Sequence, residues 1–438
     1  MQPFGKISEN ILQQLQNIVG KSFCLVDDES KLHYGHDETE DLRYYPEVIL
    51  KPQTTEQVSE ILKICFAENF PFTPRGAGTG LSGGALPVHG GVLLSLERMN
   101  HIINIDEENF QATVEPGVIT EVLQNTVREK GLFYPPDPAS KGSCFIGGNI
   151  AENSGGPKAV KYGVVKDYVL NLEMVLPDGN IIWTGANVLK NSTGYNLTQL
   201  VVGSEGTLGV VTKIVLRLIP HPQHTVLMLA PFTNVIAACA AVNKIFIAGI
   251  SPSAMEFMER DAIDWAIQHT NASIQLEKDV QAHLLVELDG NDIEQLVKES
   301  EQAATVLEQA GAIEILFAES EAQKNELWKL RRSVAEAVKA HSVYKEEDTV
   351  VPRAYLPKLL SGVKEIGKQF GFQSVCYGHA GDGNLHVNII KGNLDELTWN
   401  EKLPEAISQI FQLCKSLGGT ISGEHGIGLV QKNYLPIV

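Results

Sequence analysis

The stretch Arg75-Gly76-Ala77-Gly78-Thr79-Gly80-Leu81-Ser82-Gly83-Gly84 contains five glycines within nine residues. Such a run leaves backbone N–H groups free of Cβ atoms, and this is how a loop surrounds phosphate oxygens. Three of the glycines match G-x-G-x-x-G, but a dinucleotide fingerprint must open a helix. Here Pro87 interrupts the chain before the predicted strand 92–96, so we reject the dinucleotide interpretation. On these residues alone, a glycine-rich turn between strands is the alternative.

Three more loops of this kind follow. One is stiffened by prolines at 134–140, one is rich in Gly, Asn and Ser at 147–156, and one is Gly203-Ser204-Glu205-Gly206-Thr207-Leu208-Gly209. Each lies beside a predicted strand, and independent turns would not need so many glycines. The four loops together predict one extended ligand that is bound by many backbone amides.

A second kind of site is predicted near the C-terminus. Residues 376–388 are typical of a β-hairpin whose turn, at 381–384, brings His379 and His386 to face one point. Glu424 follows later, between glycines. Two imidazoles and a carboxylate with a position left open are the ligand set of a catalytic divalent metal. The alternative is that the histidines only complete hydrogen bonds of the turn and strand.

The composition limits the class of protein. A chain of 438 residues with 43% hydrophobic and 20% charged residues predicts a soluble globular protein of two or more domains. The net charge of −18 argues against nucleic acid or an anionic membrane as the main partner. Six scattered cysteines without a Cys-x-x-Cys pair indicate neither an iron–sulfur cluster, a structural zinc site nor a disulfide framework. With no signal peptide or spanning segment evident, we expect a cytoplasmic protein, at most peripheral to a membrane through a partner.

The order of predicted elements indicates an α+β protein. The prolines near 220 mark a boundary, after which long helices, including one at 321–341, alternate with short strands. This pattern predicts a cap with helices on one face of an antiparallel sheet. The predicted domains are an N-terminal helical segment at 1–41, a ligand-binding domain at 42–220, a cap with the metal hairpin at 221–418 and a C-terminal segment at 419–438.

The four loops resemble the flavin-binding (PCMH-type) domain of the vanillyl-alcohol oxidase superfamily. The hairpin and Gly423-Glu424-His425-Gly426-Ile427-Gly428 resemble its D-lactate, glycolate and D-2-hydroxyglutarate dehydrogenase branch. The resemblance implies a two-lobed FAD-binding domain plus an α+β cap, and FAD bound non-covalently because the first loop has no His or Cys. The residues it implies for FAD binding are Arg75, Gly76, Ala77, Gly78, Thr79, Gly80, Ser82, Gly83, Gly84, Pro138, Ser140, Gly147, Gly148, Asn149, Ala151, Asn153, Ser154, Gly155, Glu205, Gly206, Gly209 and Val210.

The resemblance also implies an activity, the oxidation of a small 2-hydroxy acid such as glycolate or D-lactate to the 2-oxo acid. The family places residues such as Arg331 and Lys345 at the substrate carboxylate. We expect Zn or Mn at His379, His386 and Glu424, His425 as the base for the hydroxyl proton, and Asn388 orienting the substrate. Ala335 stands where dicarboxylate-specific members carry a hydroxyl residue, which disfavours 2-hydroxyglutarate.

The electron acceptor is expected to be a quinone, a cytochrome or an iron–sulfur subunit, in a homodimer or a heteromeric complex. Two other functions are open: a metal-dependent hydrolase that binds a phosphorylated substrate, and a flavin-binding subunit without its own activity. Members of the family continue beyond Pro436, through a segment that closes over FAD, so we expect the 419–438 segment to return to the flavin and to be truncated.

Overall fold

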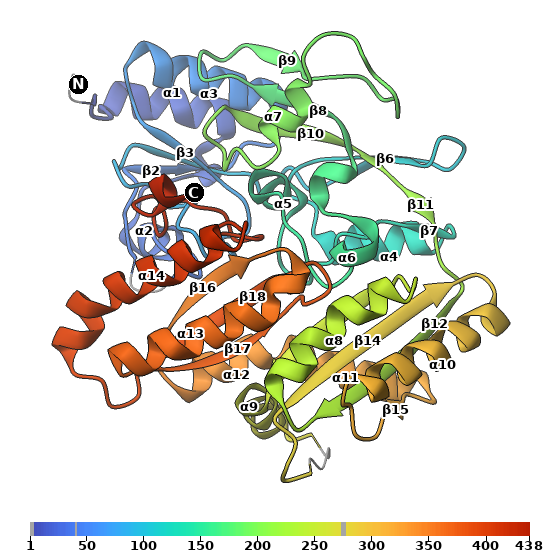
Figure 1. Cartoon of the computed structure of the whole chain (residues 1–438). Coiled ribbons are helices and arrows are strands. Elements are labelled where there is room, and N and C mark those ends of the chain that lie inside the picture. Colours follow the sequence, from blue (N-terminus) through green and yellow to red (C-terminus); the bar gives the residue numbers. More distant parts are fainter. Residues whose placement is uncertain (1–3, 40–41, 273–276) are drawn as a thin grey trace. The chain divides into compact units, whose positions relative to one another are not determined.

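The computed structural model describes residues 4–39, 42–272 and 277–438. The chain forms two compact units, whose elements are labelled in Figure 1. Unit 1 comprises Met1–Gly155, Gly163–His221 and Glu424–Lys432; the cap unit comprises Gly156–Tyr162, Pro222–Gly423 and Asn433–Val438. The second segment of unit 1 ends at His221, between Pro220 and Pro222.

Unit 1 contains two main sheets. In the first, ordered β1-β2-β4-β3, the neighbours β2, β4 and β3 run parallel, and the parallel pairing needs a crossover helix, which is α3. The second is antiparallel in the order β5-β6-β10-β8-β9, and β7 pairs with β11. The strands are β1 Cys24–Leu25, β2 Val48–Leu50, β3 Phe72–Arg75, β4 Val92–Ser95, β5 Ile102–Asp106, β6 Gln111–Val114, β7 Leu132–Phe133, β8 Val169–Val175, β9 Ile181–Trp183, β10 Val210–Arg217 and β11 Ile219–Pro220.

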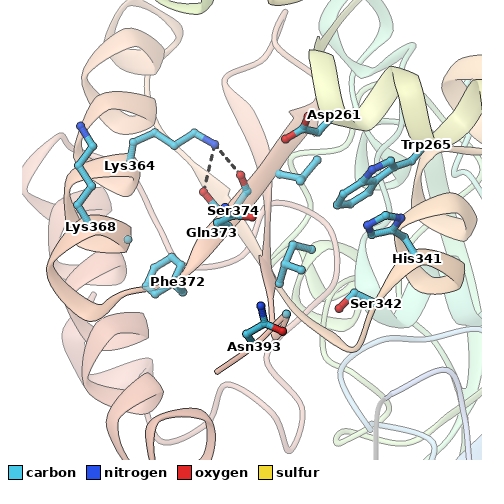
Figure 2. Close-up of a pocket in the computed structure, with 14 residues that line it drawn as sticks. Asp261, Trp265, His341, Ser342, Lys364, Lys368, Phe372, Gln373, Ser374 and Asn393 are labelled. Carbon is cyan, nitrogen blue, oxygen red and sulfur yellow. Dashed lines mark hydrogen bonds between the residues drawn. The ribbon is translucent and has the colours of Figure 1, made fainter. Parts of the chain in front are cut away.

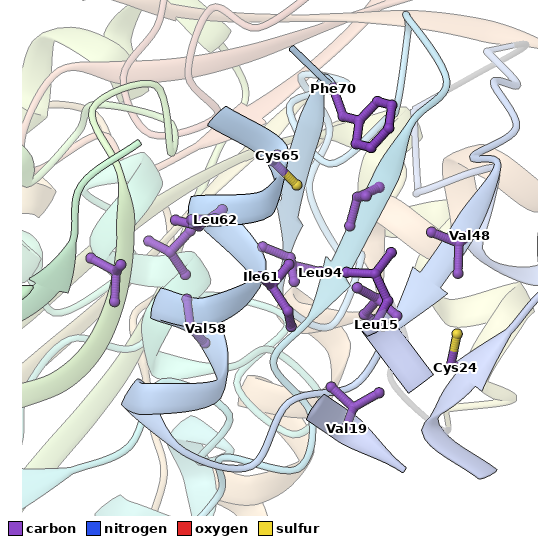
Figure 3. Close-up of a cluster of buried hydrophobic side chains, with 14 of the residues drawn as sticks. Leu15, Val19, Cys24, Val48, Val58, Ile61, Leu62, Cys65, Phe70 and Leu94 are labelled. Carbon is purple, nitrogen blue, oxygen red and sulfur yellow. The ribbon is translucent and has the colours of Figure 1, made fainter. Parts of the chain in front are cut away.

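The helices of unit 1 pack on these sheets through apolar faces. They are α1 Glu9–Val19, α2 Asp28–Tyr34, α3 Thr55–Ala67, α4 Thr120–Arg128, α5 Ile146–Glu152 and α7 Leu197–Val201. Helix α3 begins where the Thr54 side chain accepts from the backbone N–H of Gln57, and it buries positions spaced three and four apart, such as Val58 and Leu62. Helix α1 adds Leu15 and other residues to the same core (Figure 3). The N-terminal helix is therefore an integral part of unit 1.

The cap unit is built on one antiparallel sheet in the order β15-β12-β14-β13-β17-β18-β16. Its strands are β12 His224–Phe232, β13 Ala254–Glu259, β14 Ala282–Gly290, β15 Leu316–Phe317, β16 Tyr344–Val350, β17 Gln373–Gly378 and β18 Asn384–Ile390. The last two form the predicted hairpin. At its turn Gly383 has φ +89°, and a Cβ there would overlap the backbone oxygen of Val351, so this position requires glycine.

Helices cover both faces of the cap sheet. They are α6 Ala159–Tyr162, α8 Val235–Ile247, α9 Arg260–Thr270, α10 Ile293–Gln309, α11 Glu321–Arg332, α12 Val334–His341, α13 Leu356–Phe370 and α14 Leu403–Ser416. Helices α8 and α13 lie on the near side of the sheet in Figure 1, whereas α9, α11 and α12 share a core with its other face. The prediction that helices cover one face only is wrong, because strands buried on both faces need a helix layer on each side.

Two predicted elements differ in the structure. The single helix predicted at 321–341 is two helices, which break where the Ser333 hydroxyl donates to the carbonyl of Leu330. The segment predicted as a loop at 147–156 begins with α5, which ends at Asn153 in the left-handed conformation (φ +54°). The helix tolerates Gly147 because Pro116 fills the space that a side chain would need. Among the described residues, no helix is both long and apolar enough to cross a lipid bilayer.

Candidate active site

The first glycine loop, which follows β3, borders open space in unit 1. A Cβ built on Gly80 would meet no atom within 4 Å, and the same holds for Gly148 in α5. Arg75, only 6% exposed, carries an Nη1 with no hydrogen-bond partner in the described part of the chain. A buried donor without a partner and glycines that open onto free volume fit an anionic ligand such as the pyrophosphate of FAD.

Other predicted FAD-binding residues already have partners in unit 1. Asn149 donates to the Thr120 hydroxyl at 2.7 Å. The Glu205 carboxylate accepts from the backbone N–H groups of Ile427 and Gly428, at 2.8 and 2.7 Å. Glu205 therefore fixes the segment Glu424–Lys432 within unit 1, the unit that carries the glycine loops.

The remaining predicted metal ligand and the predicted base also lie in that segment. The Glu424 carboxylate packs against Gly155, at the end of the third loop, where an added Cβ would lie 2.9 Å from a carboxylate oxygen. His425 lies near the half-buried carboxyl of Glu152, and its charge lowers the pKa of that group. Burial and the nearby Glu205 carboxylate raise the pKa of Glu152 to about 8.

In the cap unit, polar side chains gather on one face of the sheet. Opposed residues of paired strands share a face, and so do residues two apart. The pairs Met258–Tyr377, Tyr377–His386 and Asp348–His386 fix this register. We call the resulting set the polar face: Glu256 of β13, Tyr377 of β17, His386 and Asn388 of β18, and Glu346 and Asp348 of β16.

One buried carboxylate joins two of the predicted functional residues. Glu256 is fully buried; both its oxygens lie 2.9 Å from Nδ1 of His379, and one lies 2.6 Å from a terminal nitrogen of Arg331. Burial raises the pKa of the Glu256 carboxyl, but the charges of His379 and Arg331 outweigh it and hold the pKa below its usual range. The structure thus brings a predicted metal ligand and a predicted carboxylate-binding residue to one acid.

The second predicted imidazole lies beside the first. The rings of His379 and His386 are 5.5 Å apart, and Nδ1 of His386 faces Glu346 at 3.2 Å and Asp348 at 3.8 Å. Each imidazole therefore has a carboxylate next to Nδ1. This arrangement orients histidines that bind a metal through Nε2, so the donor set of the cap fits a divalent metal.

Two buried side chains next to the histidines have polar atoms that the described residues do not satisfy. The Tyr377 hydroxyl lies beside the Asn388 amide, yet neither group forms a hydrogen bond of normal geometry within the described ranges. The Tyr377 ring lies 5.2 Å from the guanidinium of Arg331 and 5.3 Å from the ring of His386. Nε of Arg331 also lacks a hydrogen-bond partner among those residues. Buried donors of this kind are suited to a polar ligand.

Lys345 does not join this group. It lies between Tyr344 and Glu346 of β16, so its side chain points to the opposite face, where its ammonium nitrogen is 5.2 Å from the Trp399 ring. The register thus places Lys345 on the face opposite the residues that contact Arg331, so we leave it out of the proposed carboxylate site. Successive side chains of a strand point to opposite faces of the sheet, so a residue assigned one position too early or too late is assigned to the wrong face.

Sequence reasoning missed Glu256, Tyr377, Glu346 and Asp348. A signal for the first was available, because Glu256 is a charged residue at the centre of the apolar strand Ala254-Met255-Glu256-Phe257-Met258. The others could be recognised only from the pairing of β16 with β18.

A cavity of about 580 Å³ lies at the open end of the β17–β18 hairpin, away from its turn (Figure 2). The ammonium of Lys364, which lines this cavity, points toward Ser374 of β17. It is held by Glu259 and by the carbonyl and hydroxyl of Ser374, at 2.7 to 3.2 Å. Since an ammonium has three N–H donors, Lys364 has none left for a ligand. The cavity is therefore a poor candidate for the active site.

Comparison with known proteins identifies the class. A family model for an FAD binding domain matches residues 46–185, and one for the C-terminal domain of FAD linked oxidases matches residues 221–437. The structure also resembles that of p-cresol methylhydroxylase, with a TM-score of 0.77 and 17% identity over 95% of this chain and 88% of that one. These matches define a flavin-dependent oxidoreductase with the fold of the vanillyl-alcohol oxidase superfamily.

Relatives with higher sequence identity identify the family of flavin-dependent oxidoreductases to which the chain belongs. The chain is 37% identical to a D-lactate dehydrogenase of Anaerostipes hadrus over 441 residues, which cover 99% of this chain and 92% of that protein. It is 38% identical to the glycolate oxidase subunit GlcD of Bacillus subtilis over 434 residues, which cover 98% and 91%. The chain belongs to the FAD-linked oxidases.

Proposed function

We propose that this protein is an FAD-dependent dehydrogenase that oxidises glycolate or D-lactate to the corresponding 2-oxo acid. The observation that carries the proposal is the cluster of His379, Glu256 and Arg331 in a chain of the FAD-linked oxidases. It combines an imidazole suited to a metal with a guanidinium suited to a carboxylate, and a 2-hydroxy acid needs both. Relatives named for D-lactate and for glycolate support the substrate class.

The proposed metal ligands are His379, His386 and Glu424, with Zn or Mn as the ion. Gly423 donates its N–H to Asp348 on the polar face at 2.8 Å, and Glu424 and His425 follow it directly in the chain. The FAD would be held by the glycine loops of unit 1, with Arg75 at its pyrophosphate. When bound, the flavin accepts the hydride from C2 and the metal lowers the pKa of the substrate hydroxyl.

The residues of the chain have separate tasks in this proposal. Arg331 binds the substrate carboxylate through Nε and its remaining terminal N–H groups. Asn388 orients the substrate, and His425 takes up the hydroxyl proton, for which an imidazole has a suitable pKa of about 6.5. Ala335 offers no hydroxyl for a second carboxylate, so D-2-hydroxyglutarate should be a poor substrate. The electron acceptor would be a quinone, a cytochrome or an iron–sulfur partner; that one relative is named as a subunit supports a heteromeric complex.

The test is a spectrum of the purified protein, recorded anaerobically before and after adding glycolate, D-lactate or L-lactate. The expected result is a flavin absorbance that glycolate or D-lactate bleaches and L-lactate does not. A colourless protein that takes up no FAD would refute the proposal and leave the metal-dependent hydrolase. A yellow protein that no 2-hydroxy acid bleaches would instead indicate a flavin-binding subunit without activity.

A further inference from the structure

We infer that Glu256 is a positioning residue, which holds the metal-binding imidazole of His379 and the substrate-binding guanidinium of Arg331 in one fixed relation. This inference rests on the proposed function, since it takes the roles of these two residues from it. Glu256 itself would touch neither substrate nor flavin.

The geometry places Glu256 between its two partners. Its side chain comes from β13, His379 follows the end of β17, and Arg331 lies on α11, so three separate elements meet at one carboxylate. All three side chains are buried, with exposed fractions of 0%, 6% and 6% for Glu256, His379 and Arg331. In such a site a carboxylate that is hydrogen-bonded to an imidazole and ion-paired with a guanidinium fixes both, because none of the three can turn toward water.

The contact with His379 determines which ring nitrogen is available. When Nδ1 carries the proton and donates it to Glu256, Nε2 keeps a lone pair and is free to bind a metal. Without the acceptor, the tautomer and the ring orientation are no longer fixed. Removing such an acid from a metal-binding histidine commonly lowers metal affinity about 10- to 100-fold.

The contact with Arg331 has a second consequence. Nη2 of the guanidinium forms an ion pair with Glu256 at 2.6 Å, although neither Nη2 nor Nε has a hydrogen bond of normal geometry among the described residues. Glu256 therefore determines which N–H groups of the Arg331 guanidinium remain available for a substrate carboxylate. We expect Glu256 to affect the KM for the hydroxy acid as well as metal binding.

Strand β13 supplies a matched control. Glu259, three residues further on, is also buried, but it lies on the opposite face and accepts from Lys364 Nζ and from the backbone N–H of Cys376, at 2.8 and 2.7 Å. It has the chemistry of Glu256 without its partners. A general cost of removing a buried carboxylate from β13 should appear in both variants.

The experiment compares E256Q and E259Q in the full-length protein, with three readouts: FAD content, Zn²⁺ and Mn²⁺ affinity by calorimetric titration, and steady-state kinetics. We expect E256Q to keep FAD, to bind metal about 10- to 100-fold more weakly and to raise KM, because glutamine has no negative charge to pair with Arg331 and replaces one of the two acceptor oxygens with an NH2 group. E259Q should change the melting temperature but neither metal affinity nor KM.

Metal affinity and KM unchanged in E256Q, or changed equally in E259Q, would overturn the inference. If E256Q does not fold, E256D gives the answer, since the shorter acid keeps the charge but cannot reach both partners. It should weaken metal binding or raise KM, and wild-type values for both would contradict a positioning role. If no 2-hydroxy acid bleaches the flavin of the wild-type protein, the proposed function is contradicted instead. The metal titration of E256Q still tests the role of Glu256 in that case.

Discussion

The glycine loops of unit 1 and the polar face of the cap unit present ligands with different chemistry. These segments offer backbone groups, and their key positions are glycines that open onto free volume, such as Gly80 in the first loop and Gly148 in helix α5. The polar face offers side chains from neighbouring strands, held by buried carboxylates such as Glu256. A binding site made of backbone groups is formed by consecutive residues and can be recognised as a local sequence motif. A binding site made of side chains from several strands depends on how those strands pair. The two therefore differ in how they can be predicted and in how they should respond to mutation.

The largest effect is expected on the polar face. Replacing His386 with alanine removes a proposed metal ligand, and hydroxy acids should then fail to reduce the flavin. The protein should stay yellow, because unit 1 is unchanged. Anaerobic spectra provide the measurement, with His341→Ala, at the distant cavity, as a histidine control that should retain activity. A fully active H386A protein would remove the metal from the proposal.

The converse change in unit 1 is Gly80→Val. Since a Cβ at Gly80 meets no atom within 4 Å, valine should fold but should occupy space that we assign to FAD. The expected product is folded, pale or colourless protein with at least about 10-fold weaker FAD affinity, as for the loss of about 1.4 kcal/mol of binding energy. Circular dichroism and FAD titration measure the two properties. Normal FAD content in G80V would show that the cofactor does not approach this loop.

A third pair of variants tests the register of β16. Arg331→Met should raise KM for the hydroxy acid about 10- to 100-fold, in line with the loss of charged hydrogen bonds worth about 1.5–3 kcal/mol. Lys345→Met should be close to wild type, because Lys345 lies on the opposite face near Trp399. Steady-state kinetics of both variants decide the point. A KM effect in K345M as large as in R331M would contradict the assignment of faces.

Lys345 also shows which features of the site could be predicted from the sequence and which could not. The hairpin and the first glycine loop could be predicted from local patterns, and His379, His386 and Arg331 could be identified as candidates from local patterns and family motifs. The face of Lys345 could not, because it depends on the pairing of β16 with β18, which no local pattern fixes. Helix α5 was missed because its glycines indicated a loop, whereas the tertiary contact of Gly147 with Pro116 makes glycine suitable within a helix. Glu256 becomes recognisable only when β13, α11 and the hairpin turn are brought together.

A smaller effect is expected from Tyr377→Phe, which removes only a hydroxyl and keeps the ring between Arg331 and His386. If the hydroxyl binds substrate, KM should rise roughly 3- to 10-fold, the value of one ordinary hydrogen bond of about 0.5–1.5 kcal/mol. Metal affinity should not change. Tyr168, a buried tyrosine of unit 1, supplies the control variant Tyr168→Phe. An unchanged KM in Y377F would assign the hydroxyl to packing alone.

The smallest effect concerns a second carboxylate, the half-buried Glu152 in unit 1, which contrasts with Glu256. Cations hold the pKa of Glu256 down, whereas burial and then the nearby Glu205 raise the pKa of Glu152 to about 8. A carboxyl whose pKa is higher in the folded state than in the unfolded state binds more protons when folded. Its contribution to stability is complete below pH 4.5 and is lost as the pH rises toward 8. FAD-free protein should therefore become less stable over this range, and Glu152→Gln, which stays neutral, should flatten the decline by a few degrees in melting temperature. Thermal unfolding of both proteins from pH 5 to 8.5 measures it. If the melting temperatures of the two proteins fall in parallel with pH, Glu152 is ionised over the whole range. Glu152 and Glu256 would then differ in their partners but not in their charge.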